Sequence, residues 1–133
     1  MRTAFGPQLI GQTEKGLNAI LSKVLSGSGL EEPHWVVLRL AAQHDGDGPL
    51  AAAVADRTHF ADPEALIADL VGDGLLAQDH LTPAGTELLA RLGSQIQELT
   101  APLWRDLPLE DVAATERVLN LVSTRARSLL NSL

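Results

Sequence analysis

The sequence predicts a mainly α-helical domain that contains one very short β-ribbon. Hydrophobic residues make up 45% of the 133 residues and aromatic residues only 3%. The core must therefore be built from Leu, Val, Ile and Ala, and Ala and Leu are strong helix formers. Apolar residues recur three and four positions apart in several segments, which is the period of a helix face. Glycines and prolines separate these segments, and a chain of this length fits one domain.

The first helix is predicted over residues 8–25. One of its faces is apolar at helical spacing. The apolar positions are Ile10, Leu17, Leu21 and Val24. The Ser-Gly-Ser-Gly segment at residues 26–29 ends the helix, because glycine readily adopts the conformations of a C-cap and a turn.

The second helix is predicted to begin with Pro33 and to end near residue 43, because proline suits a first helical turn. We expect Trp35, Leu38 and Ala42 to point inward. The following segment, HDGDGP at residues 44–49, has the composition of a loop.

A short alanine-rich helix is predicted over residues 50–56, followed by a connecting turn at residues 57–61. The next helix, residues 63–71, has a strong start signal. Asp62 suits the N-cap, a proline occupies the first helical position, and Glu64 faces the positive end of the helix dipole. Glycines then end this helix.

Residues 75–81 are short enough to form only a minimal two-stranded ribbon around Asp79 and His80. A long helix is predicted to start at Thr82-Pro83, and its apolar residues form a heptad seam. The seam is Leu89, Leu92, Ile96, Leu99 and Leu103. Leu107-Pro108 interrupts the helical pattern, and a last helix is predicted over residues 109–130. Its main apolar face is Val112, Leu119, Val122 and Leu129.

This order of elements resembles the MarR family of winged-helix regulators. The matching segments are residues 35–40 (WVVLRL), 49–51 (PLA), 66–70 (LIADL), 74–76 (GLL), 81–89 (LTPAGTELL) and 107–111 (LPLED). The first segment resembles the second helix of that family, and the next three together resemble its helix-turn-helix. Residues 81–89 resemble the passage from the wing into the fifth helix, and residues 107–111 resemble the break before the last helix. Each segment is weakly specific, but their order and spacing extend over nearly the whole chain.

The resemblance implies a single MarR-like domain over residues 1–133. Residues 1–30 and 84–133 would be dimerisation helices and residues 31–83 the winged-helix lobe. It further implies a homodimer that binds double-stranded DNA and responds to a small-molecule effector. Burial of three broad apolar helix faces in a symmetric partner agrees with this interpretation. A monomeric helical bundle is the alternative, since apolar stripes occur in both.

The distribution of charge conflicts with DNA binding. The chain has a net charge of −7, and residues 50–81 alone have −5, because Arg57 is their one basic residue. Their acidic residues are Asp56, Asp62, Glu64, Asp69, Asp73 and Asp79. The presumed recognition helix, residues 63–71, contains no Lys or Arg. Because cations that meet phosphates supply most of the affinity for DNA, DNA is a doubtful partner.

Several residues remain candidates for contact with DNA. They are Arg57, Thr58, His59, Gln78 and His80. An ion pair of Arg57 with Asp56 or Asp62 explains Arg57 equally well, and His59 and His80 also fit ordinary surface histidines. Two functions therefore stay open: a MarR-like regulator with weak or atypical DNA contacts, and a winged-helix dimer that has lost DNA binding and acts as a ligand sensor or protein-interaction module.

Trp35 is the candidate for an effector pocket, because the resemblance places it near the junction where effectors of that family bind. A buried core tryptophan is the alternative. We expect no metal and no cofactor. His44, Asp45 and Asp47 lie in a glycine-rich turn without paired histidines, and no phosphate-binding loop or serine-nucleophile motif is present. The sequence therefore indicates that the protein is not an enzyme.

The absence of cysteine excludes disulfides and Cys-based zinc sites. The opening residues 1–7 lack the apolar run of a signal peptide, and no stretch approaches the roughly 20 apolar residues of a membrane span. We therefore expect an acidic, cytoplasmic protein with no membrane partner.

Overall fold

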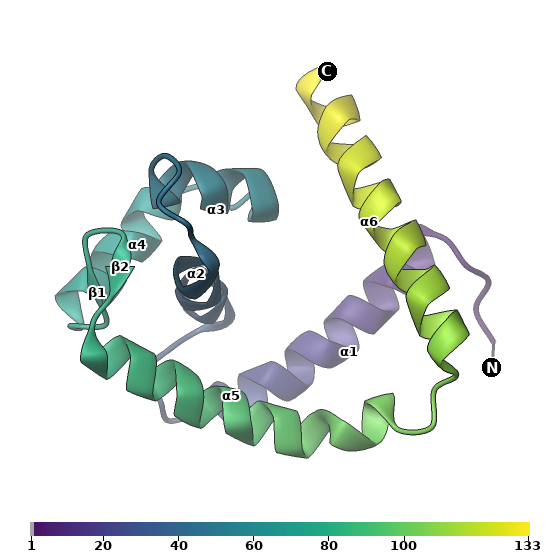
Figure 1. The fold of residues 1–133 in the computed structure, drawn as a ribbon, viewed down its shortest axis with the longest axis horizontal. Coiled ribbons are helices and arrows are strands. Elements are labelled where there is room, and N and C mark those ends of the chain that lie inside the picture. The colour runs from purple at the N-terminus through teal and green to yellow at the C-terminus, as the bar shows by residue number, and fades with distance from the viewer. Residues whose placement is uncertain (1) are drawn as a thin grey trace. The chain divides into compact units, whose positions relative to one another are not determined.

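The computed structural model describes residues 2–133, which form helices and one small hairpin (Figure 1). The elements in order are α1 (Pro7–Leu25), α2 (Glu32–Gln43), α3 (Leu50–Thr58), α4 (Pro63–Gly72), β1 (Leu76–Ala77), β2 (His80–Leu81), α5 (Pro83–Trp104) and α6 (Leu109–Asn131). The predicted elements are thus confirmed, with most ends within one or two residues. The chain divides into two compact units, and the division falls inside α5, between Glu98 and Leu99.

Helix α3 is longer than the sequence predicted. Arg57 and Thr58 were expected in a connecting turn but form its last turn. The Thr58 hydroxyl donates a hydrogen bond to the carbonyl of Val54 at 2.7 Å and accepts one from the backbone N–H of Phe60 at 3.1 Å. His59 then ends the helix in the left-handed conformation, with φ of 60°. Side-chain bonding to the backbone therefore extends α3 and fixes its end.

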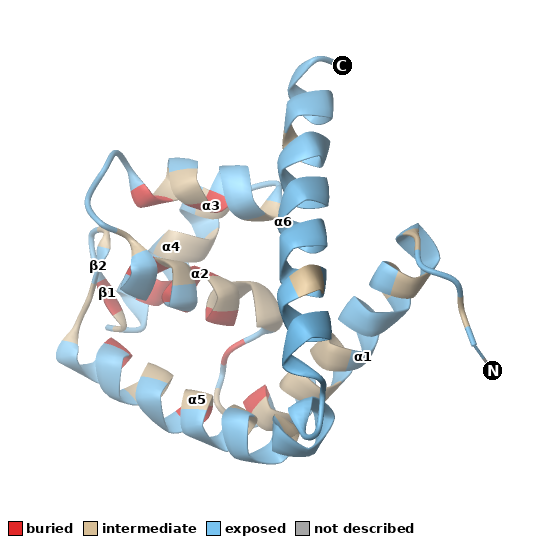
Figure 2. Cartoon of the chain, turned by 45° about the vertical axis from the view of Figure 1, so that its right-hand side comes forward, coloured by how far each residue is buried: buried red, intermediate tan, exposed pale blue. Residues whose placement is uncertain are grey.

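The core of the first unit is formed by aliphatic side chains and Trp35. The buried residues are Leu25, Leu30, Trp35, Val37, Leu38, Ala41, Leu50, Val54, Leu70, Leu76 and Leu92. Figure 2 shows buried residues at the end of α1 and in the segment that follows it, on α2, α3, α4 and the hairpin, and on one side of α5. The expectation for Ala42 was wrong, because Ala42 is exposed and Ala41 is buried. Three-residue steps from Trp35 through Leu38 reach Ala41, which keeps one helix face inward.

The predicted ribbon is a two-stranded antiparallel hairpin. Leu76 pairs with Leu81 and Ala77 with His80, so that only Gln78 and Asp79 form the loop. Gln78 has φ of 56°, a conformation that is uncommon for residues other than glycine. The hairpin is therefore a minimal wing whose short loop holds its first residue in a constrained backbone conformation.

Thr82 and Gly85 join the hairpin to α5. The Thr82 hydroxyl donates to the carbonyl of Gly74 at 2.6 Å and accepts from the N–H of Gly85 at 3.0 Å, which caps the helix. A Cβ atom on Gly85 would lie only 2.1 Å from the carbonyl oxygen of Leu75. The start of α5 therefore packs directly against backbone, and only glycine fits there.

The heptad seam of α5 changes its environment along the helix. Leu92 is buried, and Leu89 and Ile96 pack against the core of the first unit. Leu99 and Leu103, which belong to the second unit, are 56% and 45% exposed. One apolar stripe therefore supplies a core in its first half and an uncovered surface in its second half.

Helix α6 buries none of its residues, and Figure 2 shows it exposed along nearly its whole length. Its exposed large apolar residues are Leu109, Val112, Val118, Leu119, Leu121, Val122, Leu129 and Leu130. Soluble monomers rarely leave so much contiguous apolar surface uncovered.

Candidate nucleic-acid interface

The lobe that would meet DNA consists of α2, α3, α4 and the hairpin. Helices α2, α3 and α4 contact one another, β1 contacts α4, and β2 contacts α2. Asp62 caps α4 as the sequence predicted, because its carboxylate accepts a hydrogen bond from the N–H of Ala65 at 3.1 Å. Helix α4 is thereby the second helix of a helix-turn-helix, and the hairpin follows it as a wing.

The predicted DNA contacts form two groups. Arg57, Thr58 and His59 lie at the C-terminal end of α3, and Arg57 and His59 are exposed. Gln78 and His80 are both exposed on the hairpin. The hairpin loop is bonded to the N-terminal end of α3, since the Asp79 carboxylate accepts a hydrogen bond from the N–H of Leu50 at 3.1 Å. With a rise of about 1.5 Å per residue, the two ends of α3, Leu50 and Thr58, are about 12 Å apart.

Thr58 differs from the other candidates because its hydroxyl is already used. The hydroxyl proton points to the carbonyl of Val54, and its oxygen accepts from Phe60. In this conformation the side chain has no proton to donate to a phosphate. Its evident role is to complete the end of α3 beside Arg57.

The exposed face of α4 offers little for reading bases. Its exposed residues are Glu64, Ala65, Ala68, Asp69, Val71 and Gly72. The carboxylates among these side chains only accept hydrogen bonds and the others have no polar group, whereas purine edges in the major groove present acceptors. Asp62 also occupies an N–H at the start of the helix. Direct reading by α4 is therefore restricted to apolar contact and to acceptance from base amino groups.

Three carboxylates of the acidic segment hold the lobe together. Asp62 caps α4, Asp79 binds the first N–H of α3, and Asp69 lies 3.1 Å from Nε2 of His34 on α2. In the sequence, Asp69 and Asp79 count only as charges that repel DNA, and no pattern distinguishes His34. Asp62 carried a readable cap signal, but the partners of Asp69 and Asp79 lie 35 and 29 residues away along the chain.

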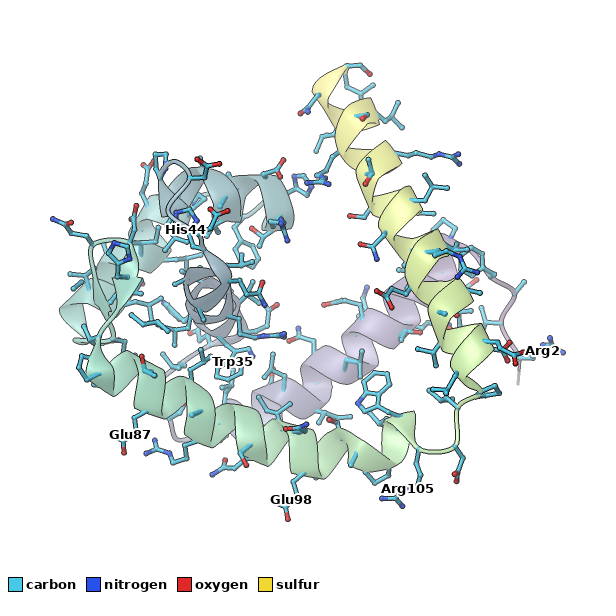
Figure 3. All side chains as sticks on the ribbon, viewed as in Figure 1. Arg2, Trp35, His44, Glu87, Glu98 and Arg105 are labelled. Carbon is cyan, nitrogen blue, oxygen red and sulfur yellow. The ribbon has the colours of Figure 1, made fainter. Side chains whose placement is uncertain are left out.

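Trp35, the candidate pocket residue, is a core side chain that is only 5% exposed. Figure 3 shows it on the side of α2 toward α5, whereas Glu87 and Glu98 point away on the outer side of α5. A Cβ atom placed on Gly93 of α5 would lie 3.9 Å from the Trp35 ring, which is ordinary van der Waals contact. Trp35 therefore joins α2 to α5 and presents almost none of its ring to solvent.

A polar region lies where α1 meets α2. Burial raises the pKa of the Glu32 carboxyl, and repulsion by the Glu14 carboxylate of α1 raises it further. On the same turn-spaced face of α1 as Glu14, the Oδ1 atom of Asn18 is buried and has no hydrogen-bond partner. The Glu14 and Glu32 carboxyls of the two helices are thus close enough to repel each other.

The loop that connects α2 and α3 is explained by turn chemistry. Nε2 of His44, labelled in Figure 3, is 2.9 Å from the carbonyl oxygen of Gly48, and the Asp45 carboxylate accepts from the N–H of Asp47 at 3.0 Å. Among residues 2–133, no group of three or more His, Cys, Asp or Glu residues is placed to hold a metal ion. No helix in the same range is long and apolar enough to cross a membrane.

Helices α3 and α4 followed by the hairpin define a winged helix-turn-helix protein. Solved structures place the architecture more narrowly. CouR from Rhodococcus jostii RHA1, bound to p-coumaroyl-CoA, superposes with a TM-score of 0.74 at 18% identity, over 86% of this chain and 89% of its own. A MarR family transcriptional regulator from Rhodococcus sp. RHA1 gives 0.72 at 18% identity, over 92% and 98%.

A third similar structure is the MarR family protein Rv2887 of Mycobacterium tuberculosis in complex with DNA. Its TM-score is 0.68 at 22% identity, over 90% of this chain and 98% of its own. The chain therefore has a MarR-like fold over most of its length. No protein-family model matches the sequence, and no curated protein is a significant match to it.

Proposed function

We propose that this chain is the subunit of a homodimeric regulator of the MarR type that binds double-stranded DNA through few, atypical contacts. The observation that carries the proposal is the complete α3–α4–hairpin arrangement with Arg57 exposed at its rim. Support comes from the likeness in fold to Rv2887, which has been solved in complex with DNA. The proposed activity is regulation rather than catalysis, and its place is the cytoplasm.

In this proposal Arg57 and His59 contact phosphates, and Gln78 and His80 approach the neighbouring groove from the hairpin. The length of α3, about 12 Å, separates its two ends by a distance that corresponds to between three and four base pairs at about 3.4 Å each. Thr58 takes part by fixing the end of α3. Because the side chains on the exposed face of α4 offer no hydrogen-bond donors, the affinity for DNA is expected to depend on these peripheral contacts, which the second subunit of the dimer supplies again.

The proposed dimer would cover the apolar surface of α6. Val112 and Leu129 lie equally far from the point between residues 120 and 121, and so do Leu119 and Val122. A second α6 running antiparallel therefore places Val112 opposite Leu129 and Leu119 opposite Val122. The residues before this midpoint include Glu110, Asp111 and Glu116 along with Arg117, whereas the charged residues after it are Arg125 and Arg127. The antiparallel arrangement therefore also brings acidic residues of one helix beside basic residues of the other.

A small-molecule effector is part of the proposal, because similar structures have been solved with p-coumaroyl-CoA and with p-aminosalicylic acid. Trp35 remains the proposed pocket residue. Since its ring is buried between α2 and α5, an effector would reach it only by separating these helices. Such a movement would link ligand binding to the lobe that carries α4.

A second function is favoured by one specific observation. The exposed face of α4 carries Glu64 and Asp69 and no cation, which suits a lobe that no longer binds DNA. In that case the dimer acts as a ligand sensor or binds another protein. The two functions differ in one measurable property, namely whether the affinity for duplex DNA depends on salt.

Fluorescence anisotropy of a labelled duplex of mixed sequence, titrated with the protein from low to physiological salt, separates them. Binding that weakens steeply as salt increases supports the regulator. Each protein cation that contacts a phosphate releases a counterion from the DNA, and this release makes the affinity depend on salt. A heat-denatured sample of the same protein provides the control for nonspecific adsorption. Absence of binding at low salt would contradict DNA binding and leave the sensor or interaction module.

A further inference from the structure

His34 connects the start of α2 to the exposed face of α4. Its Nε2 atom lies 3.1 Å from Oδ2 of Asp69, and the two side chains are 17% and 62% exposed. Its Nδ1 atom accepts a hydrogen bond from the backbone N–H of Glu31 at 3.4 Å. Both ring nitrogens of the imidazole are therefore hydrogen-bonded, Nδ1 to the backbone at the start of α2 and Nε2 to Asp69 of α4.

The two hydrogen bonds define the tautomer of the neutral ring. Because Nδ1 accepts from the N–H of Glu31, it carries no proton, and the ring proton must lie on Nε2. Nε2 then donates to the carboxylate of Asp69. A hydrogen bond to an ionised group is stronger than one between neutral groups, so this contact suits a role in orienting a helix.

Helix α4 otherwise packs through apolar side chains. Leu70 is fully buried, and Leu66 and Ile67 are partly buried against the core. Such contacts decide which face of α4 is buried, but each of them is non-directional. Asp69 precedes Leu70 and is bonded to a partly buried ring on α2, which supplies a directional contact at the last full turn of α4.

We propose that Asp69 and His34 are positioning residues, which hold α4 in the rotation that presents Ala65 and Ala68 outward. The expected effect on DNA affinity rests on the proposed function, whereas the expected effect on the orientation of α4 does not. Counting charges alone predicts that removing the Asp69 carboxylate always favours DNA. The hydrogen bond between His34 and Asp69 predicts instead that the effect on DNA binding depends on whether a hydrogen-bond acceptor remains at position 69.

The first experiment compares Asp69→Asn, Asp69→Ala and Glu64→Ala by anisotropy with the mixed-sequence duplex. Glu64 is the matched control, because it is exposed on the same helix and its replacement removes the same charge. Asn keeps an oxygen that accepts from His34, so Asp69→Asn and Glu64→Ala should bind about threefold more tightly than the unmodified protein. Asp69→Ala should bind no more tightly than the unmodified protein, because α4 is no longer fixed in its rotation.

The second experiment requires no DNA and measures hydrogen exchange of the amides of α4. Asp69→Ala and His34→Ala should each accelerate exchange several-fold, and the combined variant should exchange no faster than either one. Asp69→Asn and Glu64→Ala should exchange at the original rate. If the protein fails to bind DNA, this measurement still decides the inference.

Two results would overturn the proposal that the His34–Asp69 hydrogen bond positions α4. One is tighter DNA binding by Asp69→Ala equal to that of Asp69→Asn. The other is unchanged exchange of α4 in both Asp69→Ala and His34→Ala. Either result would mean that Asp69 acts as a surface charge alone.

Discussion

The carboxylate of Asp79 in the hairpin loop accepts a hydrogen bond from the backbone N–H of Leu50, the first residue of α3, at 3.1 Å. Leu50 itself is completely buried. The hydrogen bond thus joins the wing to the helix-turn-helix. In a count of charges, the same carboxylate would only weaken DNA binding. This hydrogen bond satisfies an N–H group that a helix start leaves without an intrahelical partner.

Replacement of Asp79 should therefore destabilise the lobe. Asp79→Ala is expected to lower the free energy of unfolding by about 1 kcal/mol, as removal of a helix cap does. Asp79→Asn, which keeps an acceptor oxygen, should reduce it by less than half of that. Urea denaturation followed by circular dichroism measures both values. Equal reductions for the two variants would show that the charge, and not the hydrogen bond, stabilises the helix start.

Two glycines of α5 should respond oppositely to alanine. At Gly85 a Cβ atom would meet the carbonyl oxygen of Leu75 at 2.1 Å, so Gly85→Ala should cost about 3 kcal/mol or prevent folding. At Gly93 the nearest atom is the Trp35 ring at 3.9 Å, so Gly93→Ala should stabilise the helix by up to about 1 kcal/mol. Thermal unfolding of both variants at equal protein concentration checks the pair, and destabilisation by Gly93→Ala would contradict the packing of Trp35 on α5.

The pH dependence of stability should reveal Glu32. Its pKa is raised first by burial and then by Glu14, so the folded chain binds this proton more tightly than the unfolded chain. The free energy of unfolding consequently falls as pH rises from the ordinary value of a glutamate through the raised one. Glu32→Gln should be more stable than the unmodified protein at pH 7.5, with the difference shrinking toward pH 4.

Urea denaturation at the two pH values measures this difference. Glu14→Gln should show a smaller gain in the same direction, because Glu14 is the lesser cause of the shift. A stability difference for Glu32→Gln that is equal at both pH values would mean that the carboxyl ionises normally.

Leu119, near the midpoint of α6, should be critical for the proposed dimer. Leu119→Lys places a charge in the centre of an antiparallel α6 pair and is expected to convert dimer to monomer. Leu133→Lys, at the 91% exposed final residue, is the matched control and should leave the dimer intact. Sedimentation equilibrium distinguishes these outcomes. A monomer in the unmodified protein would favour the helical bundle instead.

Local signals in the sequence were sufficient to predict the order of the elements. The Asp62-Pro63-Glu64 start, the Thr82-Pro83 start and the period of the apolar residues each act within a few positions, so they were readable without a structure. The expectation for Ala42 was wrong by one position, because the inward face of α2 follows three-residue steps to Ala41. The end of α3 was misplaced because the bonding of the Thr58 hydroxyl overrides a loop-like composition.

The candidate site was harder to predict, because its decisive contacts are long-range. The His34–Asp69 and Asp79–Leu50 hydrogen bonds join residues that no sequence spacing connects. A charge count treats Asp69 and Asp79 like Glu64, whereas the structure separates bonded carboxylates from an exposed one. The candidates Arg57, Thr58, His59, Gln78 and His80 remain predictions, and so does Trp35 as a pocket residue.

The central claim, that the lobe binds DNA through cations at its rim, is tested most directly by the salt dependence of binding for Arg57→Ala. Arg91→Ala, which removes an exposed cation of α5, is the matched control. If Arg57 meets a phosphate, the slope of log affinity against log salt should fall by about one unit for each Arg57 that is replaced, while Arg91→Ala leaves the slope unchanged. An unchanged slope and affinity for Arg57→Ala would contradict the claim.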